Sequence, residues 1–210
     1  MAYYPGGRLY AVREIGDAHT SVHYDEISHM AASNPDARIL LAQLWAAPAK
    51  ALTDHADRLA PFAGRDGSGR EWLFAFDGLA GNDRKTGEPF APEPLAQMCS
   101  ERVFQSVLKN LGGAAGPEQV RDAVKGALEG VAAAFEFDHL NLAISDGTAV
   151  YMARYAERES EWNELWYARL PRALVGCSQP LKTVEHPWEK LENRRLVVFD
   201  PAQNIQKLEL

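Results

Sequence analysis

The sequence predicts an α+β fold in which helices pack against antiparallel sheets, and three observations support this prediction. Strand patterns dominate the first part of the chain and culminate in an apolar run over residues 71–76. Two amphipathic helix patterns follow one another over residues 92–111 and 117–135, and from His139 onward apolar residues alternate with a period of two. Separate runs of strands and of helices are typical of α+β proteins.

Length and composition favour one domain spanning residues 1–210. The chain has 210 residues, of which 46% are hydrophobic, so it can bury one substantial core, and no linker or internal repeat divides it. The formal net charge of −7 argues against a nucleic-acid or anionic-membrane surface, since such partners attract clusters of Lys and Arg. No apolar run is as long as a membrane span and no export signal is visible, so we expect a cytoplasmic protein.

Neither a metal site nor a cofactor is expected. His19 and His23 have the spacing that places two imidazoles on one helix face, but no nearby Cys or acidic third ligand completes a zinc pattern. Cys99 and Cys177 are too few for a disulfide framework. Each lies in an apolar, periodic context, which predicts buried free thiols.

The N-terminal part of the chain predicts a hairpin, a helix and a strand. Residues 2–4 and 8–13 flank a Pro-Gly-Gly turn, which is a hairpin signal. A helix is expected over residues 17–33 and a strand over residues 37–45. The apolar residues at helical spacing are Tyr24, Ile27, Met30 and Ala31.

The apolar run from Trp72 to Phe76 predicts a strand that is buried on both faces. Asp77 and Gly78 are expected to end this strand in a tight turn whose backbone amides face a ligand. Residues 46–70, which precede the strand, are expected to form a long connection with a loop tip around Ser68. Ser68 is not a nucleophile, because its flanking glycines have the wrong spacing for a strand-to-helix nucleophile turn.

The C-terminal half predicts two helices followed by hairpins. The helix over residues 92–111 is ended by a Gly pair, and the next helix begins with a proline at its first turn. Residues 140–144 and 148–155 predict a hairpin with a two-residue Asp146-Gly147 loop. Further strands are expected over residues 165–170, 173–178 and 196–199.

A series of stretches, in this order and at this spacing, resembles the glutaminase domain of class II glutamine amidotransferases, a family of N-terminal-nucleophile hydrolases. The stretches are residues 39–47, 59–62, 71–82, 100–104, 140–147, 153–155 and 178–181. The similarity extends over about residues 3–199. It implies a four-layer αββα sandwich, in which two stacked antiparallel sheets lie between helical layers.

Compared with this family, the chain looks shortened at its N-terminus and lacks the nucleophile. The family's nucleophile is a cysteine that becomes the first residue, with its own α-amine as the base. The residue after Met1 is Ala2, whose methyl group cannot attack a carboxamide. Residues 2–7 resemble the stretch that follows the family's opening strands and glycine-rich turn.

The substrate-binding positions of the family have also changed. Trp45 stands where the resemblance implies an arginine that clamps the substrate α-carboxylate, and an indole cannot form that ion pair. Asp77 stands at the asparagine that forms the oxyanion hole together with the backbone N–H of Gly78. A carboxylate donates no hydrogen bond and repels a developing oxyanion. Cys99 replaces the aspartate that holds the substrate amino group, and Ala60 replaces a histidine.

Residues that set the shape of the family's fold persist, whereas those facing the substrate do not. The persisting residues are Trp72, Gly78, Phe104, Asn141, Asp146, Gly147, Arg154, Tyr155, Pro180, Leu181 and Trp188. The resemblance therefore predicts a vestigial substrate cleft without a catalytic residue. Its residues are Trp45, Asp77, Gly78, Cys99, Ser100 and Glu101.

We interpret the chain as a glutaminase-type fold that has lost glutaminase activity and binds a protein partner, a second copy of itself or a small amino-acid-like ligand. Two alternatives remain open. The nucleophile lies on a segment upstream of Met1, or a different hydrolase uses the same cleft through Asp77, Glu101, Cys99 and His55.

Two further expectations concern the surface and the cleft. Absence of the opening strands would expose a sheet edge and apolar surface beside it, which favours self-association or a partner protein. Loss of the arginine and gain of Asp77 would favour a cationic or uncharged aromatic ligand, with Trp45 offering a π face. The competing interpretation is that Trp45 fills the old pocket.

Overall fold

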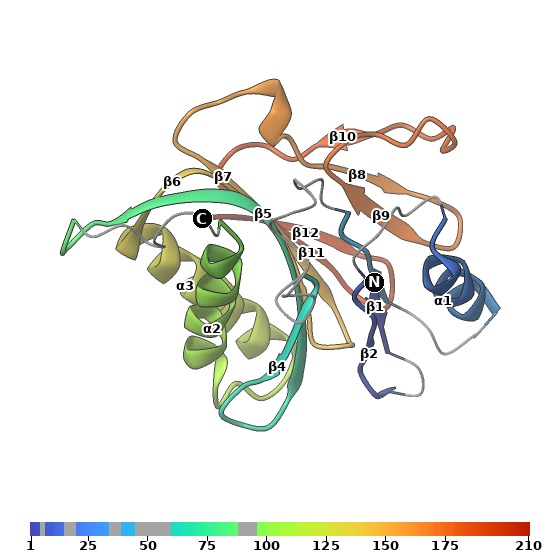
Figure 1. The fold of residues 1–210 in the computed structure, drawn as a ribbon, viewed down its shortest axis with the longest axis horizontal. Coiled ribbons are helices and arrows are strands. Elements are labelled where there is room, and N and C mark those ends of the chain that lie inside the picture. Colours follow the sequence, from blue (N-terminus) through green and yellow to red (C-terminus); the bar gives the residue numbers. More distant parts are fainter. Residues whose placement is uncertain (5–6, 15–19, 34–38, 45–59, 88–95) are drawn as a thin grey trace.

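The computed structural model describes residues 1–4, 7–14, 20–33, 39–44, 60–87 and 96–210. Within these residues a six-stranded sheet with strand order β12-β11-β7-β6-β5-β4 forms the centre of the molecule (Figure 1). Two three-stranded sheets have the orders β2-β1-β3 and β10-β8-β9, and every strand pairing is antiparallel. The helices and antiparallel sheets confirm the predicted α+β class.

The elements have the following bounds. The central sheet consists of β4 (Phe62–Arg65), β5 (Glu71–Asp83), β6 (Phe135–Ser145), β7 (Val150–Ala156), β11 (Arg195–Phe199) and β12 (Ile205–Glu209). The small sheets consist of β1 (Ala2–Tyr3), β2 (Tyr10–Ala11), β3 (Leu40–Leu41), β8 (Trp166–Arg169), β9 (Leu174–Cys177) and β10 (Glu189–Lys190). The helices are α1 (Val22–Ser33), α2 (Ala96–Leu111), α3 (Pro117–Ala134) and the short 3-10 turn η4 (Glu161–Asn163).

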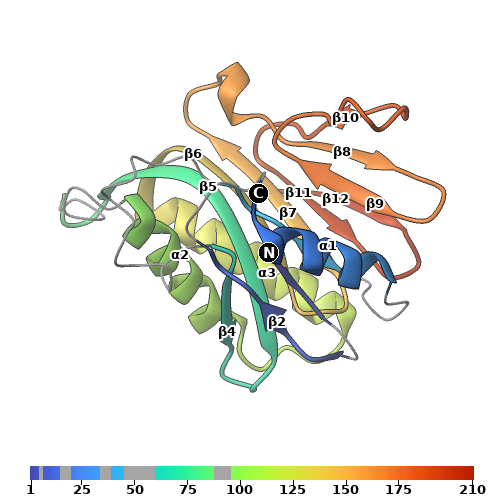
Figure 2. The ribbon, with the colours of Figure 1, turned by 45° about the vertical axis from the view of Figure 1, so that its right-hand side comes forward.

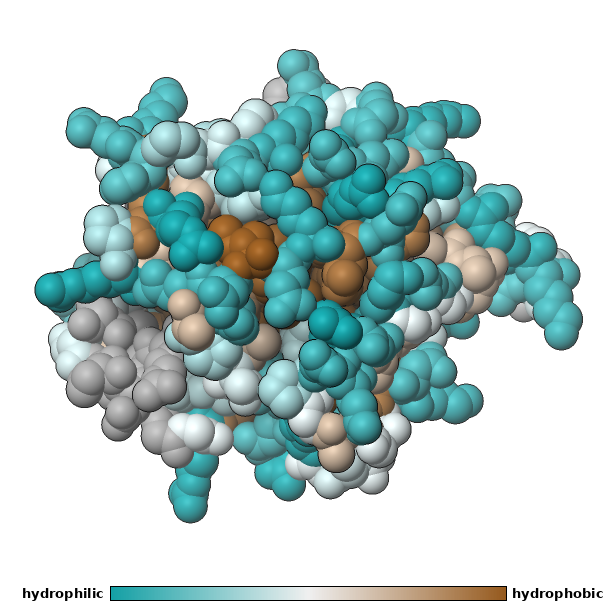
Figure 3. Space-filling view, turned by 180° about the vertical axis from the view of Figure 1, so that it is seen from behind, coloured by the Kyte–Doolittle hydropathy of each residue, from teal (hydrophilic) through white to brown (hydrophobic). Residues whose placement is uncertain are grey.

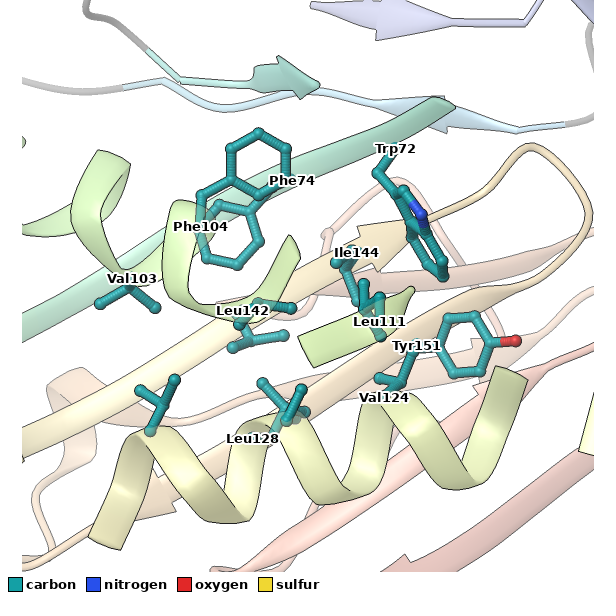
Figure 4. Packing of buried hydrophobic residues seen from close by; sticks show 14 of the residues in the cluster. Trp72, Phe74, Val103, Phe104, Leu111, Val124, Leu128, Leu142, Ile144 and Tyr151 are labelled. Atoms are coloured by element: carbon teal, nitrogen blue, oxygen red, sulfur yellow. The ribbon is translucent and has the colours of Figure 1, made fainter. Parts of the chain in front are cut away.

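One face of the central sheet, called the helix face below, packs against α2 and α3 (Figures 1 and 2). The apolar stripe predicted for the second helix is buried, at Val120, Val124, Ala127, Leu128 and Val131. Opposite these residues lie alternate side chains of β5 and β6, because side chains alternate between the faces of a strand. They are Trp72, Phe74, Phe76, Leu140, Leu142 and Ile144. Figure 4 shows Phe74 of β5 stacked on Phe104 of α2, with ring centroids 5.0 Å apart.

The other face, called the inner face below, packs against the two small sheets. Leu73 of β5 lies in one apolar cluster with Ala2, Tyr4, Ile39 and Leu41 of the N-terminal segments. A second cluster joins the central strands β7 and β11 to the sheet of β8, β9 and β10, through Met152, Leu165, Tyr167, Leu191, Val197 and Phe199. The alternating burial thus confirms that the stretch from Trp72 to Phe76 is covered on both faces.

β5 does not end at Asp77 and Gly78, so the predicted tight turn is wrong. The ladder with β6 continues through Asp77 and Gly78, and the register becomes irregular only after Leu79. Glycine is required at residue 78 because neighbouring atoms lie close to its Cα, and not because the chain turns there. A Cβ atom added at Gly78 would lie 2.5 Å from Cζ of Phe76 and 2.8 Å from the carbonyl oxygen of His139. The Asp-Gly pair is therefore accommodated inside a strand.

The loop between β4 and β5 confirms the predicted loop tip and explains how Trp72 is oriented. The Asp66 carboxylate accepts hydrogen bonds from the Ser68 and Arg70 backbone N–H groups, at 2.8 and 3.1 Å, and from Nε1 of Trp72 at 3.0 Å. Burial of Asp66 opposes its ionisation, but these hydrogen bonds outweigh the burial and hold the pKa of its carboxyl below the ordinary value. The loop thereby satisfies the polar atom of a buried tryptophan.

Two N-terminal elements differ from the prediction. α1 begins at Val22 rather than near residue 17, because the Ser21 hydroxyl caps it by accepting a hydrogen bond from the Tyr24 N–H at 2.9 Å. Of its predicted apolar stripe Ile27 is buried, whereas Tyr24 and Met30 are exposed. The first hairpin is confirmed by the pairing of β1 with β2. Of the predicted strand over residues 37–45, residues 39–44 are described, and within them only β3 is a strand.

The remaining differences concern connections. The predicted connection over residues 46–70 contains β4, which pairs with β5. The Asp146-Gly147 hairpin has a four-residue loop, since Ser145 pairs with Val150 and the Asp146 carboxylate accepts hydrogen bonds from Thr148 and Ala149. β10 and β12 were not predicted. β10 is a two-residue strand, and the residues of β12 alternate too weakly in polarity to stand out.

Several predicted features lie outside the described residues. Trp45 and His55 are among them, as is the start of the helix predicted to begin at residue 92. Cys177 is a free thiol that is half-buried rather than buried, and its burial raises the pKa of the thiol. No helix within the described residues combines the length and apolar character that crossing a membrane requires.

Candidate functional site

Three polar side chains form a row across the middle of the inner face. The strand registers place Asp77 of β5 directly opposite Asn141 of β6, and Asn141 directly opposite Arg154 of β7. Their sequence neighbours Phe76, Leu142 and Ala153 belong to the cluster under α2 and α3. Since side chains alternate along a strand, the three polar residues face the small sheets. We call Asp77, Asn141 and Arg154 the polar row.

The Arg154 side chain is held by hydrogen bonds within the protein. Its Nε donates to the carbonyl oxygen of Asn163 at 2.9 Å, Nη1 to that of Leu191 at 3.2 Å, and Nη2 to Oε2 of Glu159 at 2.6 Å. The side chain is buried, so these bonds compensate for its removal from water. Arg154 thereby ties η4 and the end of β10 to the central sheet, and it offers no unused charge to a ligand.

Asp77 lies at the open end of the polar row. Its side chain is 61% exposed, and its Oδ1 lies 3.9 Å from Nε2 of His139. His139 precedes Asn141 by two residues and lies on the same face of β6. That distance is too long for a hydrogen bond. The two side chains form an ion pair only when the imidazole is protonated. An exposed carboxylate next to Gly78 gives this part of the inner face a negative charge.

Asn141 is the least satisfied polar residue of the row. It is 2% exposed, and neither Oδ1 nor Nδ2 of its side chain has a hydrogen-bond partner within the described part of the chain. Most buried polar side-chain atoms in proteins are paired, and an unpaired one carries the full cost of its desolvation. Within the described residues, the inner face therefore holds an amide oxygen and an amide NH2 group without partners beside Asp77.

Among the described residues, a side chain and not a strand covers the outer edge of β5 near Asp77. The Gln43 amide accepts a hydrogen bond from the Phe76 N–H at 3.0 Å and donates one to the Phe76 carbonyl oxygen at 2.6 Å. The ladder of β4 ends before this point, at the pair Phe62 and Phe74. Because backbone direction repeats every second residue, the Gly78 N–H points to the same edge as the Phe76 N–H.

The other predicted cleft residues are not brought into the polar row. Cys99 and Ser100 lie in α2, but their side chains are outside the description. Glu101 is exposed on the same helix, which packs against the helix face. Among the described residues, no group of three or more His, Cys, Asp or Glu could hold a metal ion.

His139 and Asn141 were not recognised from the sequence as site residues. In the sequence, His139 marks only the change to a period of two, and the family resemblance assigns Asn141 to the residues that set the shape of the fold. A signal was present, because Asn141 interrupts an otherwise apolar strand pattern between Leu140 and Leu142. Only the pairing of β5 with β6 shows that this interruption lies opposite Asp77.

No protein-family model and no curated protein matches the sequence. The fold is similar to the solved structure of a glutamine aminotransferase class-II domain protein from Silicibacter pomeroyi, with a TM-score of 0.59 and 16% identity over 100% of this chain and 89% of that chain. A glutamine phosphoribosylpyrophosphate amidotransferase from B. subtilis has a TM-score of 0.49 at 12% identity, over 73% of this chain and 32% of that chain. A predicted glutamine amidotransferase from Pseudomonas aeruginosa has a TM-score of 0.46 at 19% identity, over 70% and 63% of the two chains. The first of these likenesses confirms, at the level of the fold, the resemblance drawn from the sequence.

Proposed function

We propose that this chain, which has the fold of a class II glutamine amidotransferase domain, does not hydrolyse glutamine and acts as a binding or partner subunit. In this proposal residues 1–210 form one domain of the αββα type, with α1 contributing to the second helical layer. Figures 1 and 2 show that α1 lies beside the small sheets and apart from α2. The ligand site of the proposal is the inner face around Asp77.

The observation that carries the proposal is the Asp77 carboxylate in the middle of β5. It is exposed on the inner face beside Gly78, where the resemblance implies an asparagine amide that donates to an oxyanion. An ionised carboxylate accepts hydrogen bonds but donates none, and its charge repels a developing negative charge. Loss of one oxyanion donor typically costs about 3 to 4 kcal/mol of transition-state stabilisation. Repulsion by Asp77 adds to this cost.

The first test is a glutaminase assay on the wild-type chain and on the Asp77→Asn variant. We expect neither to release ammonia from glutamine above a buffer blank. The variant regains a donor, but groups that act as a unit are strongly non-additive, and the resemblance places Trp45 and Cys99 at the two positions that anchor the substrate. Asp138→Asn, the same exchange at an exposed residue of β6, serves as the control.

The alternatives give different outcomes in the same assay. Ammonia release by the wild-type chain that a thiol-alkylating agent abolishes would contradict the proposal and indicate a cysteine nucleophile. Release that survives alkylation would indicate a hydrolase of another kind, acting through the carboxylates of the cleft. Circular dichroism of each variant verifies that the fold is retained.

A partner role is supported by apolar side chains exposed in the N-terminal part of the chain. They are Tyr10, Val22, Tyr24, Met30, Leu40 and Leu44. The face seen in Figure 3 presents mostly hydrophilic residues, with apolar ones in small separate areas. Exposed apolar residues mark an interaction surface where they form a contiguous patch.

We expect the wild-type chain to self-associate with rising concentration, as measured by light scattering. The double variant Val22→Ser, Leu44→Ser should shift this association to higher concentration, because it removes two of the most exposed apolar side chains. Leu181→Ser, at an exposed leucine of the C-terminal half, is the matched control and should have no effect. A monomeric wild-type chain across the whole concentration range would contradict the expectation.

A further inference from the structure

The unpaired amide of Asn141 is the feature of the inner face that the proposed function does not use. Its Oδ1 and Nδ2 are buried and lack partners within the described residues, although the residue lies in the middle of a regular strand. Nothing in the ladder requires a polar side chain there, since Leu140 and Leu142 on either side pack into the core. Because no described residue supplies the acceptor and the donor that this amide lacks, another molecule can supply them.

The charges around Asn141 indicate which group that molecule brings. On one side stands Asp77, whose carboxylate is mostly exposed and therefore reachable from solvent. On the other side stands Arg154, whose guanidinium is occupied by Glu159 and two backbone carbonyl oxygens. The unused charge next to the amide is thus negative, which favours a cationic group and disfavours a carboxylate or phosphate.

We propose that Asp77 and Asn141 form a subsite for the primary ammonium group of a small ligand that carries a neighbouring hydroxyl or carbonyl oxygen. The ammonium donates hydrogen bonds to the Asp77 carboxylate and to Oδ1 of Asn141, and Nδ2 of Asn141 donates to the neighbouring oxygen of the ligand. Each unused function of the amide then has a partner, and the charge of Asp77 is balanced. This inference rests on the proposed function, since it names the ligand class for the same inner face.

Ethanolamine, which has an ammonium group and a neighbouring hydroxyl, is the probe. Two-dimensional ¹H–¹⁵N spectra of the wild-type chain at neutral pH should show a saturable shift of the Asn141 side-chain amide signals, which are identified by their loss in Asn141→Leu. Ethylamine, which lacks the oxygen, should bind several-fold more weakly, and acetate should cause no shift.

Asp77→Asn should weaken ethanolamine binding about tenfold or more, because a charged hydrogen-bond acceptor becomes neutral. This exposed and isosteric exchange leaves the fold intact, so the test does not depend on the stability of Asn141→Leu. Asp138→Asn makes the same exchange at another exposed residue of β6, outside the pairing of Asp77 with Asn141, and it should leave binding unchanged.

Two results would overturn the inference. One is an unchanged Asn141 side-chain signal throughout the ethanolamine titration; an Asn141→Leu variant less stable than the wild type would then indicate that trapped water serves the amide. The other is equal affinity in the wild type and Asp77→Asn. Neither result bears on glutamine hydrolysis, which the ammonia assay measures separately, so a failure of the subsite and a failure of the proposed function are distinguishable.

Discussion

Replacing Phe104 by alanine is expected to lower the free energy of unfolding by about 3 to 5 kcal/mol. Phe104 is 1% exposed and lies between two aromatic rings of the central sheet, with centroids 5.0 Å from Phe74 and 6.2 Å from Phe62. Truncation removes the buried ring from both contacts and leaves a cavity between α2 and the sheet, which a regular helix closes only in part. Urea denaturation followed by fluorescence measures the change.

The control for Phe104→Ala is Gln105→Ala on the same helix. Gln105 is the next residue and is exposed, so its exchange should alter the free energy of unfolding by less than about 0.5 kcal/mol. Alanine has equal or better helix propensity than either residue, so a difference between the variants reports packing and not helix formation. A loss below about 1 kcal/mol for Phe104→Ala would contradict the stacking of α2 on β5.

Replacing Arg154 by methionine is expected to lower the free energy of unfolding by about 2 to 4 kcal/mol. Methionine keeps most of the apolar stem but leaves the carbonyl oxygens of Asn163 and Leu191 without their donor. These two oxygens belong to the segments around η4 and after β10, so the small sheet of β8, β9 and β10 should loosen first. Hydrogen exchange of its amides provides a second measurement.

The ion pair between Arg154 and Glu159 should contribute little to this loss. The Glu159 side chain is 58% exposed, and exposed partners of an ion pair are strongly screened by solvent. Glu159→Gln should therefore change the free energy of unfolding by at most about 1 kcal/mol, and the exposed Arg158→Met should change it even less. If Glu159→Gln were as damaging as Arg154→Met, the role assigned to the two carbonyl bonds would be wrong.

Local patterns predicted those elements whose stability depends on one continuous stripe of side chains. Val120, Val124 and Leu128 repeat at the spacing of one helix face, and the structure buries them against the sheet. The hairpin of β6 and β7 was predicted for a similar reason, because alternation over many residues has only one register that buries Leu142 and Ile144. Short strands such as β10 have too few residues for a pattern.

The end of β5 shows where local chemistry misleads. Asp77-Gly78 has the composition of a turn, yet the partner strand β6 holds both residues in its ladder. The residue types Asp and Gly show only that the backbone can adopt a turn. Whether it forms a strand instead depends on hydrogen bonds to residues that are distant in the sequence. Gly78 is required by the ring of Phe76 and the carbonyl of His139, and neither contact is visible in the order of residues.

The sequence by itself determined the α+β class, the faces of α2 and α3 that are buried, and the presence of a carboxylate at residue 77, because each depends on residue type and short-range period. Only the tertiary structure decided that Asp77, Asn141 and Arg154 stand in one row, that each guanidinium nitrogen of Arg154 donates a hydrogen bond, and that the Asn141 amide has no partner among the described residues. The physical reason is that strand register joins residues far apart in the chain, and whether a buried polar atom is satisfied depends on every segment packed around it.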